Sequence, residues 1–324
     1  TLFFIMAAII SGKLVKLGAS QNAKGGTELL AERLLKGTKK ELLKNTNIIF
    51  NRPDLYENYM AGSKNIFYFH DLPSDRMYKN FFESKMVNRF SHFVFNSDYQ
   101  KEEFCNKFDF KERSTSVIKN SIIPIEIKQK NYQGVVNLIY HTTPHRGLEL
   151  LAHCFPKIAA DNDKVHLKVF SSLKIYGWDE KDKVFEPLYK KLRDMKNVKY
   201  FSNLSNKEIR AELINSHIFA YPNIWPETSC LAAIEAMSAK NLVVLPNLAA
   251  LKETAGKSKF LYKFTDNVSD HINTFQKQLA LAIQFVQKQS EDYNSHLNEL
   301  KNYADMNHNL NEYLKKWEQV LSYK

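Results

Sequence analysis

The chain has 324 residues, of which 44% are apolar, and it carries a formal net charge of +11. This length and apolar content predict a globular protein with two domains. Three cysteines are too few and too scattered for a disulfide framework or a structural zinc site, and they favour a reducing compartment. The apolar run over 2–10 is about half the roughly 20 residues that a membrane span needs, and it lacks a basic start and a cleavage site. We therefore expect a buried first strand there.

The positive charge is concentrated in the first part of the chain. Residues 1–130 carry 21 Lys and Arg against 14 Asp and Glu, whereas the remaining residues carry 25 against 21. This imbalance indicates an anionic partner for the first part, such as nucleic acid, a phospholipid surface or a phosphorylated glycan. The alternative is a surface rich in Lys and Asn through compositional drift, without any such partner.

Short apolar runs alternate with amphipathic stretches along the chain. In the first half we expect strands at 2–10, 46–50, 65–70 and 92–96, with helices at 27–43 and 74–89. In the second half we expect strands at 135–140, 165–171, 198–201, 218–221 and 242–246, with helices at 147–160, 183–194, 206–215 and 229–239. Two further helices are expected at 271–290 and 310–321. The alternation predicts an α/β protein with two parallel sheets, joined by a linker over 122–134.

The segment 222–240 contains two glutamates, Glu227 and Glu235, with seven residues between them. The first lies in a proline-rich loop and the second in the helix that follows. The start of a helix presents free backbone N–H groups and the positive end of its dipole, which suits a phosphate. Each carboxylate can accept hydrogen bonds from sugar hydroxyls beside that phosphate. The segment therefore predicts a binding site for a nucleotide sugar.

Three loops of the first half follow predicted strands. Gly25 and Gly26 open a helix that Thr27 or Glu28 can cap, and the pair fits either a ligand loop or a plain turn. His70 at the end of a strand can donate to a substrate hydroxyl or transfer a proton, or it is satisfied by backbone groups. We expect the triplet 96–98 to cap a helix.

The loop 141–148 has the same layout in the second half. Arg146 stands at the start of a helix, where a guanidinium can hold a diphosphate. His141 and His145 have a spacing that suggests a metal, but Pro144 breaks the helix between them and no acidic or thiol side chain completes a set. We expect no metal. Ser205 with Glu208 forms a capping box, so a ligand contact near Asn203 would come from the backbone.

Taken in order, these features resemble family 4 glycosyltransferases of the GT-B fold. The resemblance implies two Rossmann-like parallel-sheet domains that face a cleft, with a C-terminal helix that crosses back to the first domain. The first, acceptor-side domain would cover 1–128 together with a helix at about 307–324. The second, nucleotide-sugar domain would cover 134–306.

The resemblance also implies a role for each motif residue. Glu227 would contact the hydroxyls of the donor sugar and Glu235 the ribose. Arg146 would neutralise the leaving phosphate, and His70 would lie near the transferred sugar, so His70, Arg146 and Glu227 are the expected catalytic residues. The remaining donor-binding positions, which act mainly through backbone groups, are Gly25, Gly26, Asn203, Thr228, Ser229, Cys230 and Leu231.

The sequence departs from the family pattern at three places. Thr142 and Thr143 stand where the family has a second Arg, which leaves fewer positive charges for the leaving group. Asn241 replaces the glycine after the helix and is expected to take the same left-handed conformation. Two alanines replace the glycine pair before Glu253, which makes that glutamate a weaker candidate.

The implied activity is retaining transfer of a hexose or pentose from a nucleoside diphosphate sugar to an acceptor hydroxyl, without a metal or another cofactor. We expect a UDP-sugar as donor. The acceptor is either a surface glycan or lipid-linked saccharide, or a hydroxylated nucleic-acid base. The alternatives are a non-catalytic nucleotide-sugar-binding protein and a sugar-nucleotide 2-epimerase. The expected location is the cytoplasm, with peripheral contact at the inner membrane face; a viral enzyme acting in a host cytoplasm fits the same pattern.

Overall fold

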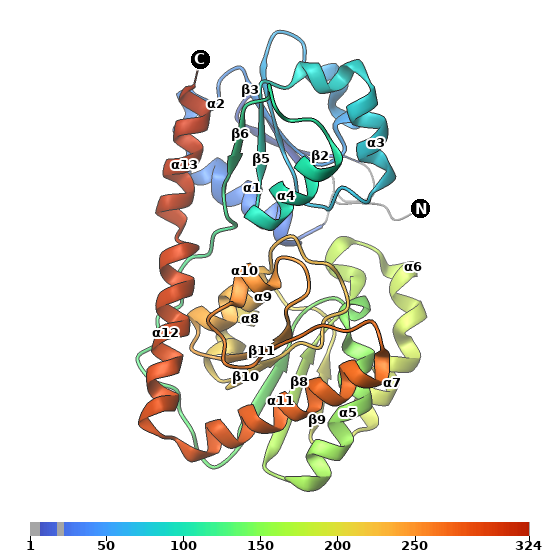
Figure 1. Cartoon of the computed structure of the whole chain (residues 1–324), viewed down its shortest axis with the longest axis vertical. Coiled ribbons are helices and arrows are strands. Elements are labelled where there is room, and N and C mark those ends of the chain that lie inside the picture. The colour runs from blue at the N-terminus through green and yellow to red at the C-terminus, as the bar shows by residue number, and fades with distance from the viewer. Residues whose placement is uncertain (1–6, 18–22, 324) are drawn as a thin grey trace. The chain divides into compact units, whose positions relative to one another are not determined.

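The computed structural model describes residues 7–17 and 23–323, and the chain forms two compact units (Figure 1). Unit 1 consists of Thr1–Ser121 and His308–Lys324, and unit 2 consists of Ile122–Asn307. The first part of the strand expected at 2–10 lies outside the described residues. No helix in the described ranges is both long and apolar enough to cross a membrane.

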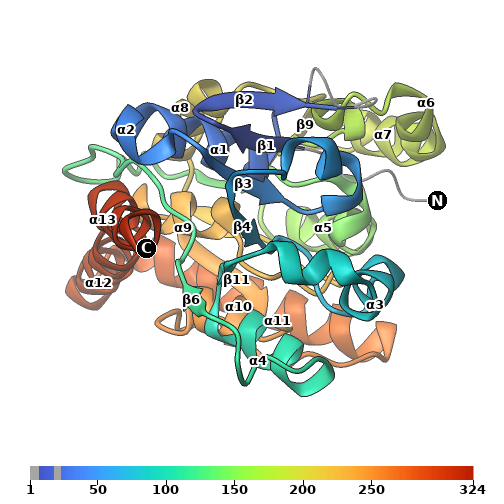
Figure 2. The same ribbon diagram turned by 90° about the horizontal axis from the view of Figure 1, so that it is seen from above.

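Unit 1 contains a six-stranded sheet in the order β2-β1-β3-β4-β5-β6 (Figure 2). Its strands are β1 (Ala7–Ile10), β2 (Lys13–Lys16), β3 (Thr46–Phe50), β4 (Lys64–Tyr68), β5 (His92–Phe95) and β6 (Thr115–Val117). From β3 to β6 all neighbours are parallel, but β1 is antiparallel to both β2 and β3. The expectation of a wholly parallel sheet is wrong at this edge, because Ser11 and Gly12 take left-handed conformations that turn the chain into a tight hairpin.

The helices of unit 1 follow the predicted pattern with more breaks. They are α1 (Gly26–Gly37), α2 (Lys40–Leu43), α3 (Arg76–Glu83), α4 (Asp98–Lys107) and α13 (Leu310–Ser322), with 3-10 turns η2 (Pro53–Tyr59) and η3 (Lys85–Arg89). The helices expected at 27–43 and 74–89 each divide, because Thr38 and Ser84 take extended conformations. The capping expectation for 96–98 is confirmed, since Ser97 Oγ accepts a hydrogen bond of 3.0 Å from the Gln100 N–H.

Helix α13 belongs to unit 1, although unit 2 precedes it in the chain. The Trp317 ring is fully buried, with its centroid 5.2 Å from that of Tyr68 in β4. Lys64 Nζ donates to the Val320 carbonyl at 2.9 Å and to the Leu321 carbonyl at 3.2 Å, which also places a cation at the end of the helix dipole. The expected return of the C-terminal helix to the first domain is confirmed.

Unit 2 contains a second six-stranded sheet, in the order β12-β11-β10-β7-β8-β9, and all its neighbouring strands are parallel. Its strands are β7 (Val136–Tyr140), β8 (Val165–Phe170), β9 (Val198–Phe201), β10 (Ile218–Ala220), β11 (Leu242–Pro246) and β12 (Leu261–Tyr262). The chain builds one half of the sheet outward from β7 and the other half outward from β10. This is the strand order of the Rossmann fold, and its switch point lies between β7 and β10.

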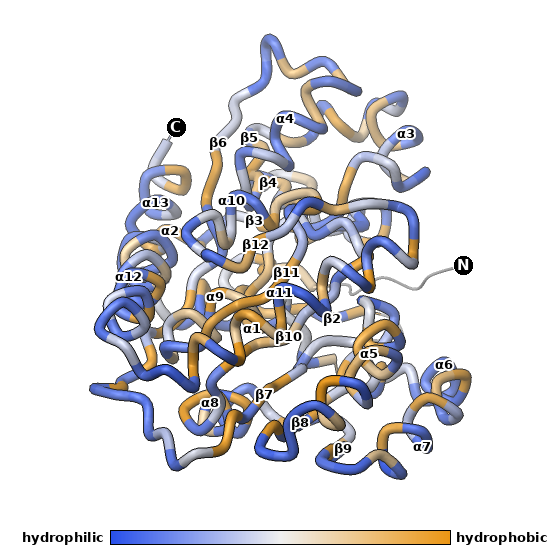
Figure 3. Tube along the Cα trace, turned by 60° about the horizontal axis from the view of Figure 1, so that its bottom comes forward, coloured by the Kyte–Doolittle hydropathy of each residue, from blue (hydrophilic) through white to orange (hydrophobic). Residues whose placement is uncertain are grey.

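Helices cover both faces of this sheet. They are α5 (Leu148–Asp161), α6 (Asp179–Asp182), α7 (Glu186–Asp194), α8 (Asn206–Ile214), α9 (Leu231–Ser238), α10 (Leu251–Ala255), α11 (Val268–Lys288) and α12 (Glu291–Asn307), with 3-10 turns η4 (Pro144–Arg146), η5 (Leu173–Tyr176) and η6 (Lys183–Phe185). Helix α9 is almost wholly apolar, because it lies between the sheet and α12 (Figure 3). Helix α12 presents many hydrophilic residues and was not predicted.

The linker expected over 122–134 is packed onto unit 2. Ile122 and Ile125 join its hydrophobic core, and the Ile125 N–H donates to Ser238 Oγ at 2.9 Å. Lys130 is buried, and its Nζ donates to the Leu213 carbonyl at 2.7 Å. Because buried lysine needs such partners, this segment has one defined position on unit 2.

Candidate functional site

Two loops leave neighbouring parallel strands at the switch point of unit 2. One connects β7 to α5 over 141–147, and the other connects β10 to α9 over 221–230. Strands β7 and β10 pair in register, with Ile218 opposite Leu138 and Phe219 opposite Ile139, so the two loops emerge at the same edge of the sheet. Open parallel sheets bind their ligands in this position.

The two loops touch each other at Gly147. This glycine has a φ of 101°, and a Cβ atom at its position would lie 2.0 Å from the carbonyl oxygen of Pro222. Only glycine fits both the backbone conformation and the contact. The close approach carries Arg146 toward the loop that holds Glu227.

Arg146 and Glu227 form an ion pair through Arg146 Nη1 and Glu227 Oε1. The Tyr221 hydroxyl donates to the same carboxylate oxygen at 2.6 Å. The Glu227 side chain is only 6% exposed and that of Arg146 23%. Burial opposes the charge of Arg146, but Glu227 beside it raises the Arg146 pKa well above its usual value. The structure thus brings together two of the three residues that the sequence predicted to be catalytic.

Polar atoms around this pair have unused hydrogen-bonding capacity. Arg146 Nε, Thr143 Oγ1 and His141 Nε2 are buried and have no hydrogen-bond partner among the described residues. The His141 ring packs on Phe219, with centroids 4.9 Å apart, and burial lowers its pKa to about 4. His141 is therefore neutral near pH 7. Buried polar atoms without partners in a native fold are typical of a site that a ligand completes.

The histidines of this loop do not form a metal site in the structure. The His145 ring packs edge-on against Trp225, with centroids 5.0 Å apart, while His141 faces Phe219. Within the described ranges no three His, Cys, Asp or Glu side chains are grouped as metal ligands. Trp225 was not singled out from the sequence; its position two residues before Glu227 was the available signal.

The start of α9 lies directly after Glu227. Cys230 occupies the N-cap position in an extended conformation, and no side chain caps the helix. The first N–H groups of a helix have no intrahelical acceptor, so the backbone at Thr228, Ser229, Cys230 and Leu231 suits an anionic group. Burial raises the pKa of the Cys230 thiol, which keeps this position uncharged. Diphosphate binding by these groups stays a prediction.

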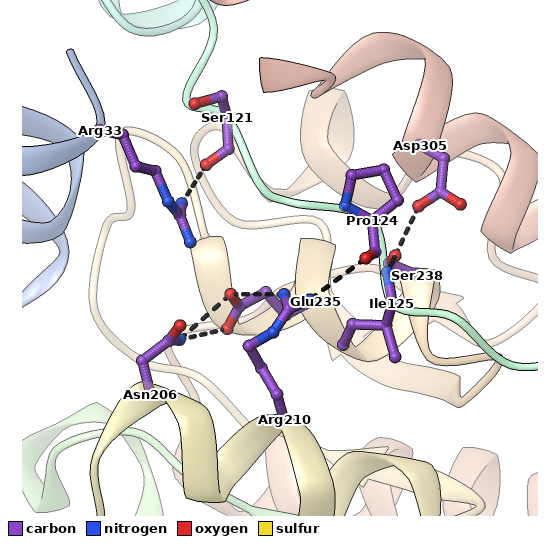
Figure 4. A network of polar contacts seen from close by, with 9 residues as sticks. All are labelled: Arg33, Ser121, Pro124, Ile125, Asn206, Arg210, Glu235, Ser238 and Asp305. Carbon is purple, nitrogen blue, oxygen red and sulfur yellow. Dashed lines mark hydrogen bonds and ion pairs between the residues drawn. The ribbon is translucent and has the colours of Figure 1, made fainter. Parts of the chain in front are cut away.

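Glu235 lies farther along α9, with a side chain that is 4% exposed. Asn206 Nδ2 contacts its two carboxylate oxygens at 3.1 and 2.9 Å, and Arg210 Nη1 lies 3.3 Å from Oε1 (Figure 4). Asn206 and Arg210 were not predicted. Their spacing of four residues places them on one face of α8, but the sequence does not say which helix that face meets.

The loop before α8 contains Asn203, which is exposed. The predicted capping box is confirmed: Ser205 Oγ accepts from the Glu208 N–H at 3.3 Å, and Glu208 Oε2 accepts from the Ser205 N–H at 2.8 Å. The loop is thereby held at the start of α8. Recognition of a base by the backbone around Asn203 stays a prediction.

The other predicted residues lie in unit 1. Gly25 is the extended N-cap of α1 and Gly26 its first residue, and neither has a positive φ. Glu28, in the first turn, is 1% exposed, and burial raises its pKa to about 7. We did not predict this buried carboxyl group. The approach of these glycines to a donor stays a prediction.

His70 lies two residues after the end of β4. Its backbone N–H donates to Asn51 Oδ1 at 3.0 Å, and its ring packs against Tyr68 with centroids 4.3 Å apart. Burial lowers its pKa to about 3. The ring is neutral near pH 7, so a contribution as a hydrogen-bonding group agrees better with this environment than transfer of a proton.

The structure corrects the expected conformation after α9. The left-handed residue is Lys240, with a φ of 57°, and not Asn241. Asn241 is fully buried, and its Nδ2 donates to the carbonyls of Leu213 and Ala236. Its side chain is thus needed for buried contacts. Ala249, in the position of an expected glycine, does take a positive φ of 52°.

Comparison with known proteins agrees with this architecture. Residues 126–284 match the sequence profile of the family described as "Glycosyl transferases group 1". No curated protein matches the chain significantly by sequence. Among solved structures, the fold is similar to that of a glycosyltransferase from Rickettsia africae ESF-5, with a TM-score of 0.68 and 15% identity over 95% of this chain and 83% of the other.

Two further solved structures were determined with a nucleotide. Anabaena Alr3699/HepE in complex with UDP has a TM-score of 0.66 and 15% identity over 91% of this chain and 82% of the other. The pneumococcal O-GlcNAc transferase GtfA in complex with UDP and GlcNAc has a TM-score of 0.62 and 11% identity over 95% of this chain and 60% of the other. The chain therefore has the GT-B fold, and its residues 126–284 are similar to group 1 glycosyl transferases.

Proposed function

We propose that the chain is a family 4 glycosyltransferase that transfers a sugar from a nucleoside diphosphate sugar with retention of anomeric configuration. The observation that carries this proposal is the buried contact of Arg146, Tyr221 and Glu227 beside the start of α9, at the switch point of unit 2, which is similar to group 1 glycosyl transferases. A UDP-sugar is the proposed donor, since similar folds have been solved with UDP or UDP-glucose.

Each group at the site has a role in this reaction. The Glu227 carboxylate accepts hydrogen bonds from hydroxyls of the donor sugar. Arg146 and the first N–H groups of α9 stabilise the charge that develops on the diphosphate. The bond between the anomeric carbon and the diphosphate oxygen breaks, and the acceptor oxygen bonds to that carbon on the same face. The departing diphosphate takes the acceptor proton, so no side-chain base is needed.

The acceptor is proposed from charge alone. The excess of Lys and Arg in residues 1–130 suits either a saccharide at an anionic membrane surface or a hydroxylated base in nucleic acid. Binding of duplex DNA would weaken steeply with salt. A titration of labelled duplex at two salt concentrations therefore separates the two acceptor classes.

A thermal-shift panel of nucleotide sugars tests the donor. A ligand at about 100 times its Kd stabilises the native state by roughly 2.7 kcal/mol, which raises the melting temperature measurably. We expect a shift with at least one UDP-sugar and a smaller one in Glu227→Gln and Arg146→Met. NMR analysis of the product then gives the anomeric configuration. Absence of any shift across UDP-, GDP- and ADP-sugars would overturn the proposal.

One observation favours a second candidate, a nucleotide-sugar-binding protein without transfer activity. Thr142 and Thr143 stand where a second cation would assist the leaving group, and Arg146 already pairs with Glu227. Incubation of the tightest-binding donor with saccharide acceptors distinguishes the two. Binding without release of the nucleoside diphosphate would support the second candidate.

A further inference from the structure

A small hollow lies on unit 2 between the segment before β7, the end of α9 and the first half of α12. Its volume is about 220 Å³, below the roughly 300–1,000 Å³ of pockets for drug-sized ligands, so it suits a small ligand. Three lysines line it, Lys128, Lys130 and Lys240, together with three amide side chains and one leucine. The lining, which lies wholly within the described residues, includes no acidic side chain. We call it the lysine hollow.

Lys130 contributes positive charge to the lysine hollow but no unused donor. Its Nζ donates to the carbonyls of Leu213 and Ile214 at 2.7 and 3.1 Å. A third acceptor, Asn241 Oδ1, lies at 3.3 Å, and an ammonium group has three N–H donors in all. Burial and the charge of Lys240 hold the pKa of Lys130 well below its usual value. An anion in the hollow would offset this unfavourable burial of positive charge.

Lys240 and Lys128 supply the donors that remain. Lys240 follows α9 in a left-handed conformation with a φ of 57°, and its Nζ donates to the Lys128 carbonyl at 2.6 Å. Two of the three N–H groups of Lys240 are left for a ligand. The charge of Lys301 also acts on Lys240, but Lys301 is paired with Asp305 at 2.7 Å. The Lys128 side chain belongs to an exposed residue and can turn toward the same volume.

We propose that the lysine hollow binds the phosphate group of a small phosphomonoester, either a soluble one or the headgroup of a phospholipid. This inference goes beyond the proposed function and does not rest on it. A phosphomonoester has three terminal oxygens and a charge of about −1.5 to −2 near pH 7, and lysine binds phosphate as a compact charge.

The number of donors favours phosphate over a carboxylate. Besides the two lysines, the amides of Gln129 and Asn298 line the hollow, and both residues are exposed. Asn294 uses one amide N–H on the Ser290 carbonyl at 3.3 Å and keeps the other. A carboxylate has two oxygens, whereas a phosphomonoester presents three to this ring of donors. The buried Leu297 gives the carbon atoms of the ester an apolar contact.

Labelling with acetic anhydride, read by mass spectrometry, tests the proposal on the wild-type protein one lysine at a time. The reagent attacks the neutral amine, so a bound anion slows it by favouring the charged form and by covering the group. A ligand at about ten times its Kd fills about nine-tenths of its sites, so inorganic phosphate or glycerol 3-phosphate should slow acetylation of Lys128 and Lys240 at least about threefold. Chloride at equal ionic strength is the reference. Lys190 and Lys191, exposed on α7, are internal controls and should keep their rates.

A shared anion also couples the two lysines. In Lys128→Gln most of the protection of Lys240 should be lost, because one of the two accessible cations around the anion is gone. Lys190→Gln changes the net charge equally and should leave the protection of Lys240 complete. Both substitutions are at exposed positions, so the variants are expected to fold.

Co-sedimentation with phosphatidylcholine vesicles, with and without phosphatidate, separates the two sources of the phosphate. Binding that requires phosphatidate, and that Lys128→Gln weakens while Lys190→Gln preserves it, assigns the site to a lipid headgroup. Protection by the soluble probes without such binding assigns it to a soluble phosphate ester.

Two results overturn the inference. One is acetylation of Lys128 and Lys240 that neither probe slows more than that of the α7 lysines. The other is protection of Lys240 that stays unchanged in Lys128→Gln, since the two side chains would then not share a ligand. The residues assigned to the donor site include no lysine, so either result leaves the proposed function intact.

Discussion

Glu227 and Glu235 have the same side chain, but different kinds of partner surround them. Glu227 accepts from Arg146 and from the Tyr221 hydroxyl, both on Oε1, and these partners come from separate loops. Glu235 is held by an amide and a guanidinium from a single helix. The orientation of the Glu227 carboxylate therefore depends on the contact between two loops. The orientation of the Glu235 carboxylate depends on the position of α8.

Removal of the Tyr221 hydroxyl tests the strength of its hydrogen bond to the Glu227 carboxylate. Hydrogen bonds to charged groups contribute about 1.5–3 kcal/mol, and those between neutral groups about 0.5–1.5 kcal/mol. We expect Tyr221→Phe to lower the free energy of unfolding by about 2 kcal/mol in urea titrations. Tyr140→Phe is the control, because its buried hydroxyl donates to the neutral Thr143 carbonyl, and it should cost about 1 kcal/mol. A larger loss for Tyr140→Phe would contradict a charged Glu227.

His217 links the stability of unit 2 to pH. Its Nδ1 accepts from the Asn137 N–H and its Nε2 donates to the Asn131 carbonyl, both at 3.0 Å, so the ring has to be neutral. Burial and the nearby Lys130 lower its pKa from 6.5 to about 4. Between these values the unfolded chain binds a proton that the folded protein does not. The free energy of unfolding contributed by His217 is therefore full above pH 6.5 and falls as pH drops toward 4, by up to about 3 kcal/mol.

Urea titrations from pH 7.5 to 4.5 test this dependence. His217→Gln should reduce the slope of unfolding free energy against pH in this window, whereas His166→Gln, exposed on β8, should keep the wild-type slope. Equal slopes in the two variants would show that His217 is not the group responsible.

At the scale of elements, the site depends on the contact between the β7–α5 and β10–α9 loops. Gly147→Ala places a Cβ atom 2.0 Å from the Pro222 carbonyl oxygen at a φ of 101°, so backbone has to move. We expect a loss of about 3 kcal/mol in stability and a strong loss of donor binding. Gly134→Ala is the matched control: its φ is 79°, but no atom lies within 4 Å of the added Cβ. It should cost about 1 kcal/mol and leave donor binding unchanged. Equal losses would refute the packing argument.

The sequence predicted those helices and strands that are determined by the pattern of their own residues. The strands at 46–50, 198–201 and 242–246 have the observed bounds, because each is a short segment rich in apolar, aromatic or β-branched residues. Helix α12 escaped prediction, since its buried stripe is diluted by asparagines and its stability comes from packing on α9. The strand containing β1 was expected, but its antiparallel pairing and the strand β2 were missed, because a hairpin with lysines on its second strand resembles a loop.

The residues of the candidate site also fall into two groups, those that the local sequence indicates and those whose role follows from packing. Arg146 and Glu227 could be singled out because loops at strand ends and helix starts have recognisable sequences, and the structure places the two in contact. Asn206 and Arg210 could not, because their importance follows from the packing of α8 on α9. The neutral state of His70 was equally hidden, since it results from burial in the folded unit.

At the scale of the whole molecule, unit 1 is completed by α13. Trp317→Ala removes a fully buried ring that contacts Tyr68 and Tyr313. We expect a loss of about 3–5 kcal/mol confined to unit 1. Hydrogen exchange read by mass spectrometry should show faster exchange in β3, β4 and β5 and unchanged exchange in β7, β10 and β11. Lys316→Ala, exposed on α13, serves as the control. Faster exchange in both sheets would show that the two units unfold together.

The membership of α13 in unit 1 also has a consequence for biosynthesis. Unit 2 is one continuous stretch, Ile122–Asn307, whereas unit 1 needs both the residues before it and those after it. On the ribosome, the polypeptide of unit 1 emerges first, yet its Trp317 site stays empty until all of unit 2 has been translated. Nascent domains usually fold in the order of their synthesis. Here the domain whose synthesis starts first is the last to be finished, and chaperones that bind exposed aromatic surface have that whole interval in which to act.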